Sequence, residues 1–100
     1  MKLSPREIEK IMIYSLANVA QSRKEKGIKL NYPEAVSIIA STAMESAREV
    51  NDLETVMNKS RDVLTKDDVM EGVADLIPQI QVEAIFTDGS RLVTVHDPIR

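Results

Sequence analysis

The feature that most constrains the fold of this chain is a stretch of ten residues, 35–44, that contains no charged side chain. A helix start precedes it. Asn31 can cap the first turn, Pro33 falls where no backbone amide is needed, and Glu34 completes a capping box three residues after the cap. A helix that is uncharged over such a length is normally covered on more than one side. We therefore expect a helix over 31–50 that is either the centre of the domain or shared with a partner.

The apolar side chains of this helix should gather on one half of its surface, because successive residues are about 100° apart around the axis. The polar positions within 35–44 are only Ser37, Ser41 and Thr42. The expected apolar half consists of Ala35, Val36, Ile39, Ala40, Ala43, Met44, Ala47 and Val50.

An earlier helix is expected from Ser4 to about Lys26. Ser4 and Glu7 have the spacing of a second capping box, and Pro5 occupies the first helical position. Gly27 can end the helix in a left-handed conformation. The basic residues at positions 23, 24 and 26 complement the negative end of the helix dipole.

The middle of this first helix, 11–20, is apolar in nearly every direction around its axis, with Ser15 and Asn18 as the polar breaks. A helix on the surface of a monomer shows a single apolar stripe instead. Because so short a chain has few elements with which to cover such a helix, we infer a partner subunit. The inference fails if residues 11–20 are largely buried within the isolated chain.

Two further helix starts follow. Asn51 or Asp52 is expected to cap a third helix, and Thr65 is expected to begin a fourth. The acidic residues 67 and 68 would stabilise the fourth helix, because they lie near the positive end of its dipole. Gly72 should stop the fourth helix after one or two turns. The third helix should carry a narrow apolar stripe of Leu53, Val56, Met57, Ser60, Val63 and Leu64.

The hydrophobic period then changes from helical to alternating, which predicts a strand over 79–86. Asp88-Gly89 is a favoured two-residue turn, so a hairpin with a return strand to Pro98 is expected. A two-stranded ribbon alone is marginal in water, so it must lie on the helices or extend a sheet of another chain. The predicted pairs are Thr87 with Ser90, Ala84 with Val93, Val82 with Val95, and Ile85 with Leu92.

The expected fold class is therefore α+β, a small bundle of about four helices (about 4–72) followed by a C-terminal β-hairpin (about 79–97). With 100 residues, we expect one domain over 1–100. The net charge of −3 argues against a phosphate-binding surface, and the lack of cysteine excludes disulfides, thiolate metal sites and thiol nucleophiles. No signal-peptide core or membrane-length apolar run is present, so a cytoplasmic location is expected.

The sequence assigns no catalytic, cofactor-binding or metal-binding residue. His96 is the single histidine, so neither a histidine-rich metal site nor a histidine-paired nucleophile can be assembled. A hard-metal site at Asp67, Asp68 and Glu71 is conceivable, but helix-start electrostatics explains these carboxylates without a metal. The three glycines, 27, 72 and 89, are used as helix stops or in a turn, so no phosphate-cradling loop remains.

Helices followed by a hairpin are also the outline of a winged helix. Against DNA binding, the second helix is uncharged where base contacts would be needed, and the third offers only Lys59 and Arg61. The residues alone therefore favour a small interaction domain. It could be a protein-interaction adaptor or, as the other alternative, a winged-helix-like module.

Several long motifs follow one another along the chain. They are Leu3-Ser4-Pro5-Arg6-Glu7, Leu30-Asn31-Tyr32-Pro33-Glu34-Ala35-Val36, Met44-Glu45, Val63-Leu64-Thr65-Lys66-Asp67-Asp68-Val69-Met70-Glu71-Gly72-Val73, Ile80-Gln81-Val82-Glu83-Ala84, Asp88-Gly89 and Leu92-Val93-Thr94-Val95-His96-Asp97-Pro98-Ile99. In this order and spacing they resemble the gamma subunit of bacterial-type urease over essentially the whole chain. Where that family usually has Gly-Ala-Arg-Asp-Gly, this chain has Ser46-Ala47-Arg48-Glu49-Val50, and a glycine is common in the family at the position of Ser60.

The resemblance implies a non-catalytic subunit of an enzyme that hydrolyses urea to ammonia and carbamate. It implies partners in the urease alpha and beta subunits, in an alpha-beta-gamma unit repeated threefold or in a higher multiple, with no nucleic acid or membrane partner. The two nickel ions of that family belong to the alpha subunit. No catalytic or nickel-binding residue carries over to this chain, and the first two helices and the hairpin are expected to carry most of the contacts.

Overall fold

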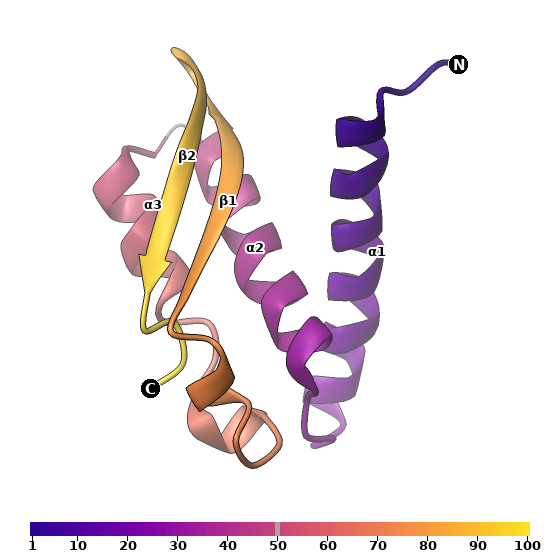
Figure 1. Cartoon of the computed structure of the whole chain (residues 1–100), viewed down its shortest axis with the longest axis vertical. Coiled ribbons are helices and arrows are strands. Elements are labelled where there is room, and N and C mark those ends of the chain that lie inside the picture. The colour runs from indigo at the N-terminus through magenta and orange to yellow at the C-terminus, as the bar shows by residue number, and fades with distance from the viewer. Residues whose placement is uncertain (50) are drawn as a thin grey trace.

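The computed structural model describes residues 1–49 and 51–100. Within them the chain forms α1 (Pro5–Glu25), α2 (Tyr32–Arg48) and α3 (Leu53–Ser60), then two 3-10 turns, η1 (Lys66–Asp68) and η2 (Ala74–Leu76). The strands β1 (Gln79–Phe86) and β2 (Gly89–His96) complete it as an antiparallel hairpin (Figure 1). The predicted α+β class with a C-terminal hairpin is confirmed, but the described residues hold three α-helices instead of about four.

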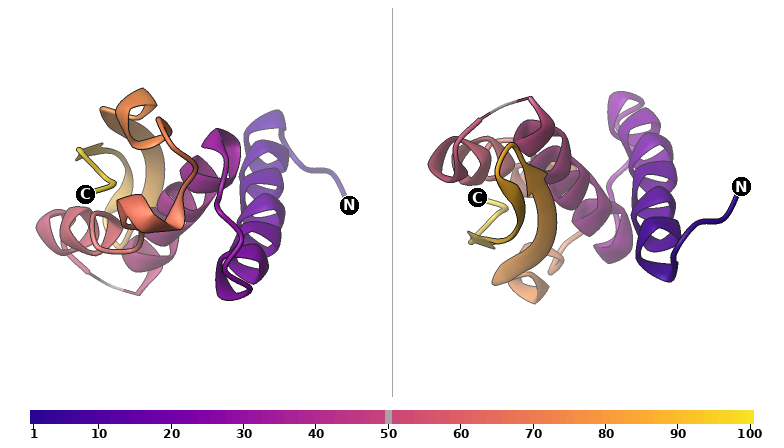
Figure 2. Two further views of the ribbon diagram at one scale, coloured as in Figure 1. Left: turned by 90° about the horizontal axis from the view of Figure 1, so that it is seen from below. Right: turned by 90° about the horizontal axis from the view of Figure 1, so that it is seen from above.

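Helix α2 is the central element. It contacts α1 on one side and β1 and α3 on the other, and the end-on views show it between α1 and the hairpin (Figure 2). Ile39 and Ala43 are fully buried, and even Ser37 and Ser46 are closed off from solvent. The uncharged stretch is thus covered within the chain. Of the two positions expected for this helix, the centre of the domain is therefore confirmed. The helix ends at Arg48, and Val50 lies outside the described residues.

The predicted starts of α1, α2 and α3 are confirmed by hydrogen bonds that join a cap to the backbone three residues on. The Ser4 amide donates to Glu7 Oε1 over 2.8 Å, and the Glu7 amide donates to Ser4 Oγ over 3.2 Å. Of the two candidates for α3, Asp52 is the cap, with its carboxylate accepting from the Thr55 amide at 2.8 Å. Helix α1 also ends as predicted, because Gly27 has φ of 78°.

The predicted fourth helix is wrong. Thr65 does begin a turn, and its amide donates to Asp68 Oδ2 over 2.8 Å, but the turn is a single 3-10 turn. The reason is a contact with the distant Leu30, whose amide donates to the Asp68 carbonyl over 3.0 Å and whose carbonyl accepts from the Met70 amide over 2.8 Å. This bridge holds Val69 in an extended conformation, φ −119° and ψ 159°, so the helix cannot continue.

The apolar stripe predicted for the third helix is longer than the helix itself. Helix α3 buries Val56 and Ser60 but ends there, and Val63 and Leu64 lie beyond it. Leu64 is buried, not as a helical residue, but as an extended one that forms a parallel bridge with Ile99 near the end of the chain. The segment after α3 is therefore tied to the C-terminal residues.

The hairpin is confirmed, but its register differs by two residues from the prediction. Phe86 pairs with Gly89 and Val82 with Val93, so that residues 87 and 88 form the turn. A type I′ turn at Asp88-Gly89 would need positive φ at both residues, and an aspartate adopts it at a cost. In the structure Gly89 alone takes it, with φ of 123°.

This register change leaves the two faces of the ribbon as predicted. Because side chains alternate, a shift of two residues returns each side chain to the same face. Ile80, Val82, Ala84 and Phe86 still face the core, together with Val93 and Val95. The core-facing side packs on α2 and leaves the opposite side exposed.

Candidate interaction surface

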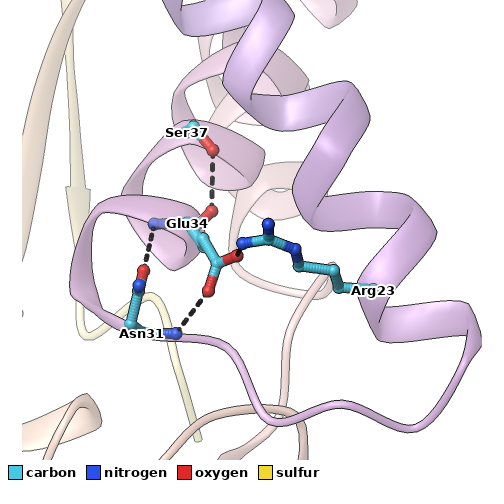
Figure 3. Close-up of polar contacts among 4 residues, drawn as sticks. All are labelled: Arg23, Asn31, Glu34 and Ser37. Atoms are coloured by element: carbon cyan, nitrogen blue, oxygen red, sulfur yellow. Dashed lines mark hydrogen bonds and ion pairs between the residues drawn. The ribbon is translucent and has the colours of Figure 1, made fainter.

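The junction between α1 and α2 is held by one buried carboxylate. Glu34 is nearly closed off from solvent, and its side chain pairs with the Arg23 guanidinium of α1 (Figure 3). The same carboxylate accepts from the Asn31 amide at 2.9 Å, and the Ser37 hydroxyl donates to the Glu34 carbonyl over 2.7 Å. Of these partners, the Arg23 guanidinium and the Asn31 amide satisfy the buried charge, which would be costly without them. The capping box of α2 therefore also attaches that helix to α1.

The hydrogen bond from the Asn31 amide lowers the pKa of Glu34, and Arg23 lowers it further, against the desolvation that raises it. Because the folded-state pKa lies below the unfolded value near 4.5, the carboxylate contributes stability above that pH and loses it as pH falls through the folded value. For Glu34→Gln we expect the loss of unfolding free energy relative to wild type to be greatest above pH 5 and to shrink on acidification. Guanidinium denaturation of both purified chains at a series of pH values measures this difference. A loss that is independent of pH would contradict it.

Arg23 was predicted only to complement the helix dipole, and its partner Glu34 was missed. No local pattern could have found the pair, since the two residues lie on different helices. The available signal was indirect. A carboxylate that caps a helix destined for burial needs a cation nearby, because charged groups are almost never fully buried without a partner.

The side of α1 that faces away from α2 is apolar and exposed. We call this side the outer face of α1 and define it by Ile8, Ile11, Met12 and Val19, which recur at helical spacing. Met12 is 64% exposed, whereas Ala17 and Ala20 on the opposite side are buried. Residues 11–20 are thus not largely buried within the chain, and the condition that would have overturned the inference of a partner is not met.

Helix α1 and strand β1 are separated by a groove that two ion pairs cross. Arg6 Nη1 lies 3.3 Å and Lys10 Nζ 3.4 Å from the Glu83 carboxylate. Hollows of about 220 and 240 Å³ flank these pairs and reach Met44 of α2. The outer surface of the hairpin is likewise apolar in part, because Ile85 and Leu92 are exposed on it.

A polar contact between α1 and α2 lies in the wall of the same groove. The Tyr14 hydroxyl of α1 donates to the Glu45 carboxylate of α2 over 2.7 Å. Desolvation, followed by the hydrogen bond and the charge of Glu45, raises the pKa of Tyr14 to about 12. Tyr14 is therefore a neutral hydrogen-bond donor and not a base.

The residues weighed as metal ligands do not come together. His96 is exposed at the end of β2. The Asp68 carboxylate accepts from the Thr65 amide at the start of η1, where a fourth α-helix had been predicted. Residues 1–49 and 51–100 contain no group of three or more histidine, cysteine or acidic side chains placed to hold a metal ion. Nor does any helix among them have the length and apolar content to cross a membrane.

The fold and its exposed apolar surfaces define a small α+β interaction protein. Comparison with known proteins gives the family. Residues 1–99 match the family described as "Urease, gamma subunit". Proteins named urease subunit gamma from Edwardsiella ictaluri, Photorhabdus laumondii and Yersinia rohdei are 69%, 71% and 71% identical to it over 100 residues, which is the whole of each chain. The chain belongs to the urease gamma-subunit family and is thus a structural subunit of urease, a hydrolase.

Proposed function

We propose that this subunit is non-catalytic and packs against the alpha and beta chains of urease, in a unit repeated threefold or in a higher multiple. The alpha chain would carry both nickel ions and hydrolyse urea to ammonia and carbamate. The observation that carries the proposal is the outer face of α1, where several large apolar side chains are exposed together. Exposed apolar patches of this kind mark interaction surfaces.

The hairpin supports the same proposal. Ile85 and Leu92 are diagonal neighbours on its exposed side, because Ile85 pairs with Ser90 and Leu92 pairs with Glu83. Helix α2, in contrast, is covered by its own chain, so we assign the contacts to α1 and the hairpin. The cytoplasmic location stays a prediction.

Isolation of the tagged chain from its native cells tests the proposal. We expect larger chains in equal amounts, bound nickel and ammonia release from urea by the complex, but no activity from this chain alone. The mass of the intact complex gives the multiplicity. A lone inactive monomer would contradict the proposal and favour a free-standing adaptor.

DNA binding by a winged-helix arrangement finds no support in the described residues. Helix α2 is buried, and Lys59 of α3 lies 3.9 Å from the Glu49 carboxylate in an ion pair. A basic helix face that could enter a major groove is therefore not formed by α2 or α3.

A further inference from the structure

The hairpin has a free backbone edge on each side, because its sheet consists of β1 and β2 alone. In an antiparallel pair, every second residue hydrogen-bonds to the neighbouring strand, and the residues between direct their N–H and C=O groups outward. Phe86 and Gly89 close the two-residue turn as a hydrogen-bonded pair, so the alternation starts from them. Counting along β2 in this way places the backbone groups of Leu92 and Thr94 on its outer edge.

The outer edge of β2 is open. Apart from the hairpin ladder, no backbone group of residues 90–95 bonds to another backbone group of residues 1–49 or 51–100. Helix α3 contacts β2, but the buried residues of this strand are Val93 and Val95, which lie on its core-facing side. Figure 1 shows that β2 lies on the side of the ribbon away from α1. Backbone groups on this edge therefore have only water to pair with in the free chain.

The other edge of the ribbon, that of β1, is protected. Natural proteins shield a free edge with charged side chains, with proline, with a bulge or with a covering element, because an open edge pairs with any other strand. Strand β1 carries Glu83, whose carboxylate forms ion pairs with Arg6 and Lys10 of α1 at 3.3 and 3.4 Å. These cations and their helix stand where a further strand would have to approach β1.

Strand β2 lacks these protections. It contains no lysine or proline, and its pairing with β1 runs over all eight residues without a bulge. Arg91 is its one arginine, and this side chain is used at the turn. It pairs with the Asp88 carboxylate and lies over the Phe86 ring, 5.4 Å from the centroid. An unprotected edge of this length indicates a strand that is covered in the assembled protein.

The backbone of the edge selects an extended chain as its partner. The outward groups of Leu92 and Thr94 recur about 7 Å apart along the strand, which is the spacing of the groups that a second strand presents. A helix uses its backbone groups internally and has none to offer along its side. Addition of a strand to an exposed sheet edge is a recurrent mode of recognition, in which main-chain hydrogen bonds provide the affinity.

The side chains beside the edge limit the sequence of that partner strand. Leu92 is 61% exposed on the outer side of the ribbon, and its neighbours along the edge, Ser90 and Thr94, are uncharged. Apolar side chains that lie opposite one another stabilise a sheet, whereas a charge against Leu92 would lose hydration without gaining a partner. The segment that fits is therefore uncharged, with an apolar residue beside Leu92.

We propose that an extended segment of a neighbouring urease subunit pairs with the outer edge of β2 and converts the hairpin into a three-stranded sheet. This rests on the proposed function, because it needs the assembled complex. It specifies the contact made by the hairpin, which consists of main-chain hydrogen bonds to residues such as Leu92 and Thr94 together with an apolar contact to the Leu92 side chain.

Hydrogen–deuterium exchange of the free chain and of the purified complex, resolved to single residues by mass spectrometry, tests the pairing. The amides of Leu92 and Thr94 should exchange rapidly in the free chain and at least about tenfold more slowly in the complex, where they donate to another strand. The amide of Val93 donates to β1 and should be protected in both samples, which makes it the internal control. Equally rapid exchange of Leu92 and Thr94 in the two samples would overturn the proposal.

The dissociation rate of the complex gives a second measurement. Thr94→Pro removes one outward N–H and leaves the ladder to β1 complete, as proline is tolerated at an edge position of this kind. It should raise the rate at least about tenfold. Gln81→Pro is the matched control, because Gln81 pairs with Thr94 and its N–H points to the opposite edge.

Two outcomes of this comparison separate the possibilities. Equal dissociation rates for Thr94→Pro and Gln81→Pro would overturn the proposal, even if the Leu92 and Thr94 amides are protected in the complex, because the edge would then be covered without being paired. Protection of the Val93 amide in the free Thr94→Pro chain checks that the hairpin is intact. Failure of the wild-type chain to purify with larger chains would instead refute the proposed function.

Discussion

Met12→Glu is expected to prevent this chain from joining the urease complex while leaving its own fold unchanged. Met12 lies near the centre of the outer face of α1 and is 64% exposed. In the isolated chain the new carboxylate would stay in water, and exposed substitutions of this kind change stability by about 0.5 kcal/mol or less. In the complex it would be buried against an apolar surface without a partner, which costs several kcal/mol. We expect the fraction incorporated to fall by at least about tenfold.

Co-purification with the larger chains measures incorporation, and circular dichroism of the purified chain checks its fold. Gln21→Glu is the matched control, because it makes the same change of charge on α1 at an exposed position away from the outer face. Full incorporation of Met12→Glu would show that the outer face is not an interface. The assignment of subunit contacts would then pass to the hairpin.

Ile39→Ala should give the largest loss of stability. Ile39 is completely buried at the centre of α2, and its removal would leave a cavity between helices and hairpin. Substitutions of this type cost about 2–5 kcal/mol, against a total stability of about 5–15 kcal/mol for a domain of ordinary size.

Ile39→Val, which removes one methylene group, should cost about 0.5–1.5 kcal/mol and is the control. Guanidinium denaturation of the purified chains measures both values. A cost below about 1 kcal/mol for the alanine variant would contradict the position of α2 at the centre of the core.

The features that could be predicted from sequence share one property, which is that the interacting groups are close along the chain. The caps of α1, α2 and α3 join residues three positions apart, and the stop at Gly27 depends on the conformation of a single residue. The two faces of the hairpin follow from alternation alone. The family was recognisable for a related reason, since its motifs are continuous segments, and comparison confirmed it.

The candidate surfaces divide in the same way. An exposed apolar surface on α1 could be inferred from sequence, because the apolar residues of this helix point in nearly all directions. So small a chain has too few elements to cover all of them. The Arg23–Glu34 pair could not, since its two residues belong to different elements.

The sequence by itself thus determined where α1 and α2 begin and that a hairpin ends the chain, and it limited α2 to the centre of the core or an interface with a partner. The tertiary structure decided how far elements extend and how they pair. Leu30 draws the backbone of residues 68–70 into an extended bridge and so limits a plausible helix to one 3-10 turn. The sequence could not determine the hairpin register, because a shift of two residues leaves every side chain on the same face of the ribbon. It was decided by the backbone of the turn, where only Gly89 takes a positive φ.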